Sequence, residues 1–65
     1  MTAEEVVDEL IRRREDGKRH ALLSVYDVTR IDDIADIALL ANWHVLSVSF
    51  DVGNTAHILV RYEAP

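Results

Sequence analysis

The sequence predicts an α+β domain in which two helices pack on one face of a three-stranded mixed sheet. Three observations support this class: two segments with helical periodicity, a strand-like segment between them, and a C-terminal hairpin pattern with one strongly apolar face. The expected element order is therefore αβαββ, that is helix, strand, helix, strand, strand. At this length the chain is expected to form a single small domain, residues 1–65.

The first helix is expected at residues 3–16. Its apolar residues fall on one helical stripe, and Thr2 with Glu5 matches a capping box at the start. Gly17 follows as the residue that ends the helix in a left-handed conformation. Acids fill the first turns and arginines occupy residues 12–14, which complements the helix dipole at both ends. The acids are Glu4, Glu5, Asp8 and Glu9.

The only basic concentration in the sequence is RRREDGKR at residues 12–19. Two acids interrupt it, no aromatic residue interleaves for base stacking, and a helix C-terminus is the unfavourable dipole end for a phosphate. Asp8 with Arg12 and Glu9 with Arg13 have the spacing of helical ion pairs. We interpret the run as a solvated helix end.

Residues 20–28 are expected to form the first strand, because apolar side chains alternate along part of this segment. Ala21, Leu23 and Val25 share the face that meets the helices. The opposite face carries His20, Leu22, Ser24 and Tyr26.

The second helix is expected to begin at Thr29, whose spacing from Asp32 matches another capping box. It extends to about Ala41, with Asn42 suited to the left-handed position that follows. A broad arc of this helix is apolar, so most of it is expected to be buried. The remaining narrow stripe is acidic, with one large aliphatic residue a turn beyond it: Asp32, Asp33, Asp36 and Leu40.

Residues 44–63 have the pattern of a hairpin whose register decides which face is buried. A two-residue loop sets apolar against polar side chains, whereas a loop one residue longer pairs Phe50 with Ile58 and leaves one apolar face. Gly53 or Asn54 can supply the positive φ that this loop requires. The expected core face of the first hairpin strand comprises His44, Leu46, Val48, Phe50 and Val52.

The crossover between the first two strands is expected to be right-handed, which places the second helix on the apolar face of the sheet beside the first. The third strand lies either at the edge or between the other two, as in half of a ferredoxin-like fold. Its HILV run at residues 57–60 favours the central position. Trp43, between helix and strand, is interpreted as a large apolar plug of the core.

Side chains with catalytic potential occur on the outward sheet face. In the expected register Asp51 faces His57, with Ser47 and Ser49 nearby, but a flat strand offers no oxyanion hole. The three histidines lack the spacing of metal ligands, and no glycine-rich phosphate loop occurs. We therefore expect no enzyme activity, no cofactor, and no catalytic or metal-binding residues.

Composition narrows the class of partner. Twelve acidic and seven basic residues give a net charge of -5, which argues against direct nucleic-acid binding through phosphates. No apolar run approaches the roughly 18 residues of a membrane span, and the N-terminus has acids where a signal peptide has bases. The chain contains no cysteine, which fits a reducing cytosol. We expect a cytoplasmic protein that makes no membrane contact.

The acids of the two helices are the first candidate site, with Leu40 as an anchor for a protein partner that has a basic surface. This hypothesis predicts a non-enzymatic regulator or inhibitor. Its sharper version is a nucleic-acid mimic, analogous to anti-CRISPR inhibitors, that blocks a nucleic-acid-binding complex.

The outward sheet face is the second candidate site, because it is too apolar for a fully hydrated surface. The alternative hypothesis is therefore a homo-oligomeric assembly or regulatory module, most simply a homodimer, joined through this face. The expected interface residues are Leu22, Tyr26, Val45 and Leu59. An enzyme is the third hypothesis, which the lack of a convergent polar cluster opposes.

Overall fold

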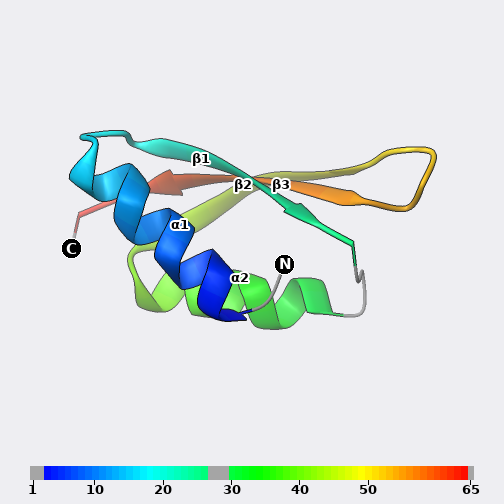
Figure 1. The fold of residues 1–65 in the computed structure, drawn as a ribbon, viewed down its shortest axis with the longest axis horizontal. Coiled ribbons are helices and arrows are strands. Elements are labelled where there is room, and N and C mark those ends of the chain that lie inside the picture. The colour runs from blue at the N-terminus through cyan, green and yellow to red at the C-terminus, as the bar shows by residue number, and fades with distance from the viewer. Residues whose placement is uncertain (1–2, 27–29, 65) are drawn as a thin grey trace.

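The computed structural model of the chain describes residues 3–26 and 30–64. It contains α1 (Ala3–Glu15), β1 (His20–Val25), α2 (Ile31–Leu40), β2 (Trp43–Phe50) and β3 (Ala56–Tyr62), as Figure 1 shows. The α+β class and the element order agree with the prediction. The capping boxes expected at Thr2 and Thr29 involve residues outside the described ranges. Gly17 and Asn42 follow the two helices with positive φ values of 75° and 65°, which confirms both expected left-handed positions.

The sheet is antiparallel throughout, with strand order β1-β3-β2. The predicted mixed sheet was therefore wrong. The crossover through α2 leaves β1 and β2 running in the same direction, but β3 lies between them and runs the opposite way. Each hydrogen-bonded pair is consequently antiparallel, and the HILV segment occupies the central strand.

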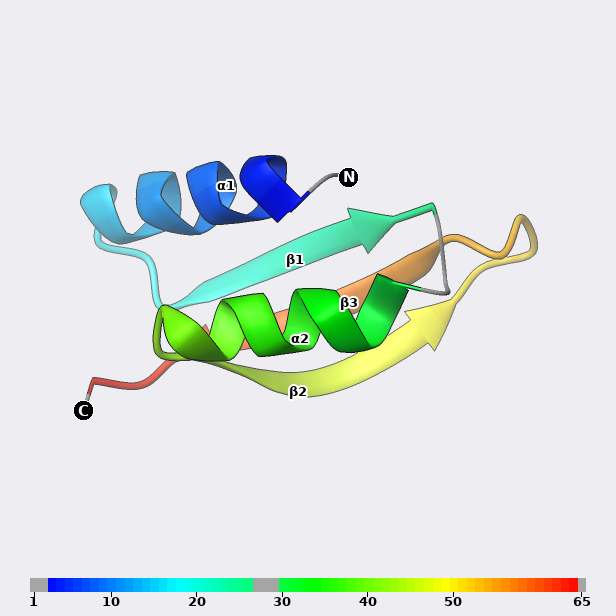
Figure 2. The ribbon, with the colours of Figure 1, turned by 90° about the horizontal axis from the view of Figure 1, so that it is seen from below.

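Both helices lie on one face of the sheet (Figure 1). Seen from the helix side, α1 lies along the β1 side of the sheet and α2 lies across the region of β3 and β2 (Figure 2). The opposite face of the sheet is left without a covering element among the described residues. This arrangement makes the protein a two-layer structure with one open sheet face.

The hairpin register differs from the expected one by two residues, because Val48 pairs with Ile58 and not with Val60. The loop is correspondingly longer and comprises residues 51–55. Asn54 supplies the expected positive φ, at 61°. A shift of two residues preserves which side chains share a face in this part of the hairpin.

A β-bulge at Leu46 changes the face assignment in the first half of β2. Val45 pairs with Val60 and so lies on the helix-bearing face, although it was predicted on the outward face. His44, predicted on the core face, pairs with Arg61 on the outward face. Both predictions were wrong because a strict alternation cannot show where an extra residue is inserted.

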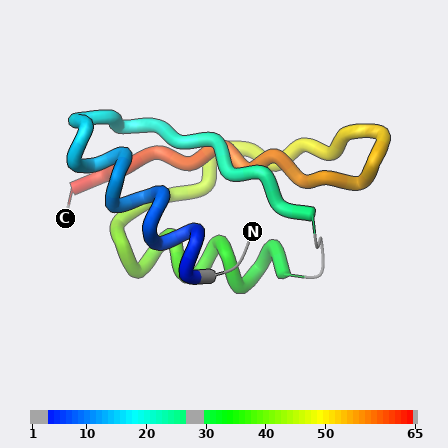
Figure 3. The backbone as a smooth tube through the Cα atoms, in the orientation of Figure 1, coloured from blue at the N-terminus to red at the C-terminus, as the bar shows by residue number. Residues whose placement is uncertain are grey.

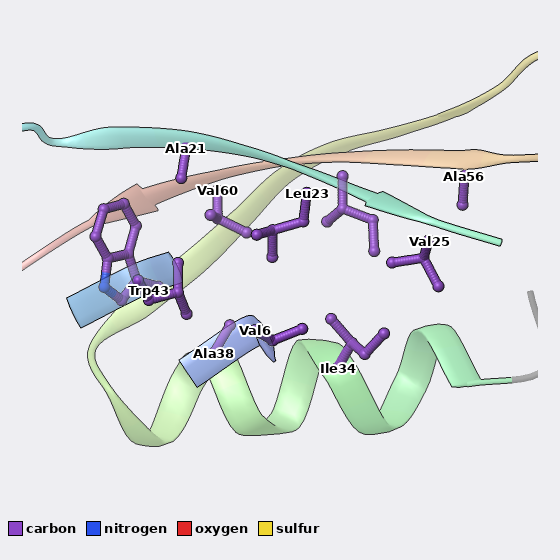
Figure 4. Packing of buried hydrophobic residues seen from close by; sticks show 11 residues of the cluster. Val6, Ala21, Leu23, Val25, Ile34, Ala38, Trp43, Ala56 and Val60 are labelled. Carbon is purple, nitrogen blue, oxygen red and sulfur yellow. The ribbon is translucent and has the colours of Figure 1, made fainter. Parts of the chain in front are cut away.

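The core forms between the helices and the two strands β1 and β3 (Figure 4). Of β2, only Trp43 is buried, so the predicted core face of this strand was wrong. A helix of ten residues spans about 15 Å, whereas a strand of eight spans about 26 Å, so α2 is too short to cover β2. Figure 3 shows the hairpin extending beyond the helices. The buried residues are Val6, Leu10, Ala21, Leu23, Val25, Ile34, Ala38, Trp43, Ala56, Ile58 and Val60.

Candidate functional site

An open groove of about 530 Å³ lies between α1 and α2. Three apolar side chains line it, Val7 from α1 and Ile37 and Leu40 from α2, together with the carboxylates Glu4 and Asp8. Leu40 is 87% exposed, the highest exposure of any large apolar residue in a described helix. The groove thus combines an exposed apolar surface with negative charge.

The groove follows from the helical repeat of both segments. Val7 follows the buried Val6, and Ile37 precedes the buried Ala38, so each lies about 100° around its helix from a core residue. Such positions flank the core stripe and face the neighbouring helix where two helices pack side by side. The apolar stripe of each helix is wider than the core can cover, and its margin is exposed in the groove.

Three of the acids of α1 separate into two groups. Glu4 and Asp8 line the groove. Glu9 instead accepts hydrogen bonds from Arg12 and Arg13, each at 3.2 Å. The predicted pair of Glu9 and Arg13 is confirmed, whereas Arg12 binds Glu9 and not Asp8. Glu9 is therefore neutralised locally, and the groove acids carry the negative charge that a partner could contact.

The acidic stripe of α2 is exposed as predicted, at Asp32, Asp33 and Asp36. None of the three lines the groove. Leu40 does line it, and the adjacent Leu39 is also exposed, at 53%, but lies outside the groove lining. The structure therefore joins Leu40 to the acids of α1. Which acids lie beside Leu40 depends on how the two helices pack, and the pattern of each helix alone does not show this.

The outward sheet face carries Leu22 beside Leu59, which are register partners. Leu22 is 55% exposed, and Tyr26, directly after β1, is also exposed. Val45 lies on the other face, so the four predicted interface residues do not form one surface. The apolar part of the outward face is consequently smaller than predicted.

β2 presents a larger exposed apolar surface than the outward face does. β2 is an edge strand of the sheet, and the loop end of its hairpin extends beyond the helices (Figure 3). We call this set the β2 patch: Val45, Leu46, Val48, Phe50 and, in the loop that follows, Val52. The period-two alternation of the hairpin placed four of these five residues in the core, so it did not indicate the patch. The lengths of the second helix and the hairpin strand could have indicated it.

A row of polar side chains crosses the other end of the outward face. His57 Nδ1 lies 3.2 Å from Ser24 Oγ, and His57 Nε2 lies 3.2 Å from Asp51 Oδ2. The register places Ser49, not Asp51, opposite His57, so the predicted cross-strand partner was wrong. The longer loop nevertheless brings the Asp51 carboxylate onto the imidazole.

The Asp51 carboxylate also organises the hairpin loop. Its Oδ1 accepts hydrogen bonds from the backbone N–H groups of Gly53, at 2.8 Å, and Thr55, at 3.0 Å. The Thr55 and His57 hydrogen bonds, in that order, lower the pKa of Asp51 below its usual value of 3.8. Acyl transfer would further require N–H donors directed at a developing oxyanion beside Ser24, which lies near the end of β1 on an open sheet face. The row is therefore best explained as a hydrogen-bond network that holds the hairpin loop in place.

Comparisons with protein-family models, curated proteins and solved structures gave no match. Among residues 3–26 and 30–64, no group of three or more His, Asp or Glu side chains is arranged to hold a metal ion. No helix within the same residues is long and apolar enough to cross a membrane. The exposed surfaces of the described residues are therefore the features that bear on function.

Proposed function

We propose that this chain is a cytoplasmic, non-enzymatic protein-binding module that docks on a basic surface of a partner protein and regulates or inhibits it. The observation that carries the proposal is Leu40, 87% exposed in a groove that Val7 and Ile37 line together with Glu4 and Asp8. An exposed leucine beside carboxylates complements a segment that presents both apolar and basic side chains. The apolar contacts would supply affinity, and the acids would supply steering and specificity.

The nucleic-acid mimic is the sharper version of the same proposal. The exposed acids of α2 support it, because they form a second negative surface outside the groove: Asp32, Asp33 and Asp36. A site that binds phosphates offers cations but no pocket for a leucine, however. The apolar lining therefore favours a partner segment of mixed apolar and basic character over a pure phosphate-binding site.

Two matched double variants separate these versions. Glu4→Gln with Asp8→Asn removes the groove acids, and Asp32→Asn with Asp36→Asn removes two acids outside it, so each raises the net charge by two. The tagged protein and both variants are used to capture partners from an extract of the native cell or host, with salt steps to about 0.5 M. The proposal predicts that only the groove variant releases the partner at lower salt. Equal weakening by both variants would support the mimic, and no weakening by either would refute both versions.

A homo-oligomeric assembly module is the second candidate function, and the β2 patch is the observation that favours it. Phe50 is 58% and Leu46 50% exposed on an edge strand that carries no Asp, Glu, Lys or Arg. Edge strands with apolar side chains and free backbone groups readily pair with another strand. Oligomer formation through β2 would cover this patch, and sedimentation equilibrium of the wild type and of Phe50→Ser tests it.

A further inference from the structure

A concave site of about 370 Å³ lies at the end of the protein where α1 ends, β1 begins and β3 ends. This is the end that carries the C-terminus in Figure 1. Three arginines from separate parts of the chain meet there, Arg14 from α1, Arg19 from the turn before β1 and Arg61 from β3. The remaining lining residues are Tyr62, Glu63 and Ala64.

Tyr62 organises two of these arginines. The guanidinium carbon of Arg14 lies 3.7 Å from the centre of the Tyr62 ring, which is the geometry of a cation–π contact. Arg14 Nη1 also donates to the backbone carbonyl of Lys18, at 3.4 Å. The backbone N–H of Tyr62 donates to the carbonyl of Arg19, at 2.8 Å, which ties the start of β1 to the end of β3. The fold therefore holds the Arg14 guanidinium and the backbone of Arg19 at this site.

The charge of this site is opposite to that of the whole chain. The lining contains three arginines and one acid, Glu63, which gives it a formal charge of +2 in a chain of -5. Within the described residues none of these three arginines forms an ion pair, whereas Arg12 and Arg13 share Glu9. Glu63 Oε2 lies 3.7 Å from His44 Nε2. The site thus has cationic donors that the protein itself does not neutralise.

We propose that Arg14, Arg19 and Arg61 form a binding site for a small phosphorylated molecule. A guanidinium group presents paired N–H donors that match two oxygens of one phosphate, and the site volume is at the lower end for small-molecule sites. The surrounding negative charge of the chain repels a polyanion such as a nucleic-acid strand, and Glu63 repels a second anionic group. A single phosphate ester on a small organic group fits both constraints. This site is separate from the helix groove and does not depend on the function proposed for it.

The test is a ¹H–¹⁵N NMR titration of the whole chain with inorganic phosphate, with sodium chloride adjusted to hold ionic strength constant. We expect saturable shifts of the Arg19, Arg61 and Tyr62 amides, with a dissociation constant on the order of a few millimolar. Arg61→Gln should weaken binding about fivefold or more. Arg12→Gln removes the same charge from an arginine paired with Glu9 and should change binding less than about twofold.

Chemical-shift changes that do not saturate with phosphate would overturn the site. Equal weakening of phosphate binding by the Arg61 and Arg12 variants would overturn it as well, because both results indicate general charge screening. Acetate at the same ionic strength separates phosphate from other anions. Equal affinity for acetate would overturn the assignment to phosphorylated ligands. Tighter binding of glycerol 3-phosphate than of inorganic phosphate would support a phosphate ester as the ligand, and weaker binding of the ester would contradict it.

Discussion

Trp43 packs edge to face against Tyr62, its register partner in the neighbouring strand, with ring centroids 5.7 Å apart and ring planes at 63°. Trp43 is 1% exposed and is the largest fully buried side chain, whereas Tyr62 is half-buried and carries Arg14 over its ring. The pair therefore connects the core to the site lined by Arg14, Arg19 and Arg61, which we call the arginine site. Trp43 is also the only buried residue of β2.

Replacing Trp43 should have the largest effect on stability. Truncating a buried tryptophan to alanine typically costs about 3–5 kcal/mol, which is comparable to the whole stability that a core of this size supplies. We expect Trp43→Ala to be largely unfolded at 25 °C and Trp43→Phe to fold with a lower urea midpoint. Far-UV circular dichroism during urea titration measures both. Leu39→Ala, at an exposed position, serves as the control and should change stability by less than about 0.5 kcal/mol.

A wild-type midpoint for Trp43→Ala would contradict the role of this residue in the core.

The role itself could be predicted from the sequence, because a tryptophan between a helix and a strand of a small domain has few other places to pack. The element order could be predicted as well, because the helical and strand periods differ clearly along the chain.

The faces of β2 could not be predicted, because the bulge at Leu46 leaves no mark in a pattern where residues 45, 46 and 48 are all apolar. The mixed sheet was wrong because β1 and β2, which run in the same direction, are not neighbours: β3, whose central position its HILV run favoured, lies between them and is antiparallel to both. The exposure of the hairpin depends on the relative lengths of α2 and β2, which the periodicity of either segment alone does not show.

The two candidate binding sites depend on tertiary contacts. The pattern of each helix indicated an acidic stripe, but the packing of α1 beside α2 decides that Glu4 and Asp8, and not the acids of α2, accompany Leu40. The basic run at residues 12–19 was interpreted as a solvated helix end. Arg61 joins Arg14 and Arg19 only because β3 ends beside them, so no local pattern indicated the arginine site.

Asp51 should make the hairpin loop sensitive to acid. Its pKa is lowered in the folded protein, so its stabilising contribution is present above its usual value of 3.8 and is lost as the pH falls through the lower folded value. We expect Asp51→Asn to lower the urea midpoint at pH 7. The difference from the wild type should shrink as the pH approaches 2.5. Urea titrations at several pH values measure this, and a difference that stays constant with pH would contradict the loop role of the carboxylate.

The β2 patch predicts the behaviour of the chain in solution. If the second candidate function is correct, sedimentation equilibrium should give twice the chain mass at micromolar concentrations. Phe50→Ser should then shift the protein to the monomer, and Leu22→Ser, on the outward face, should not. A wild-type monomer at all concentrations would exclude the assembly function. Dissociation by the Leu22 variant alone would place the interface on the outward face.

The most direct test of the central claim compares two adjacent leucines of α2. Leu40 and Leu39 are both exposed and have the same helix propensity, but only Leu40 lines the groove. Each is changed to serine, and binding to the captured partner is measured by titration calorimetry. If the groove is the docking site, Leu40→Ser should weaken binding about tenfold or more and Leu39→Ser should leave it nearly unchanged. Equal affinities of the two variants would contradict the claim that the protein acts through this groove.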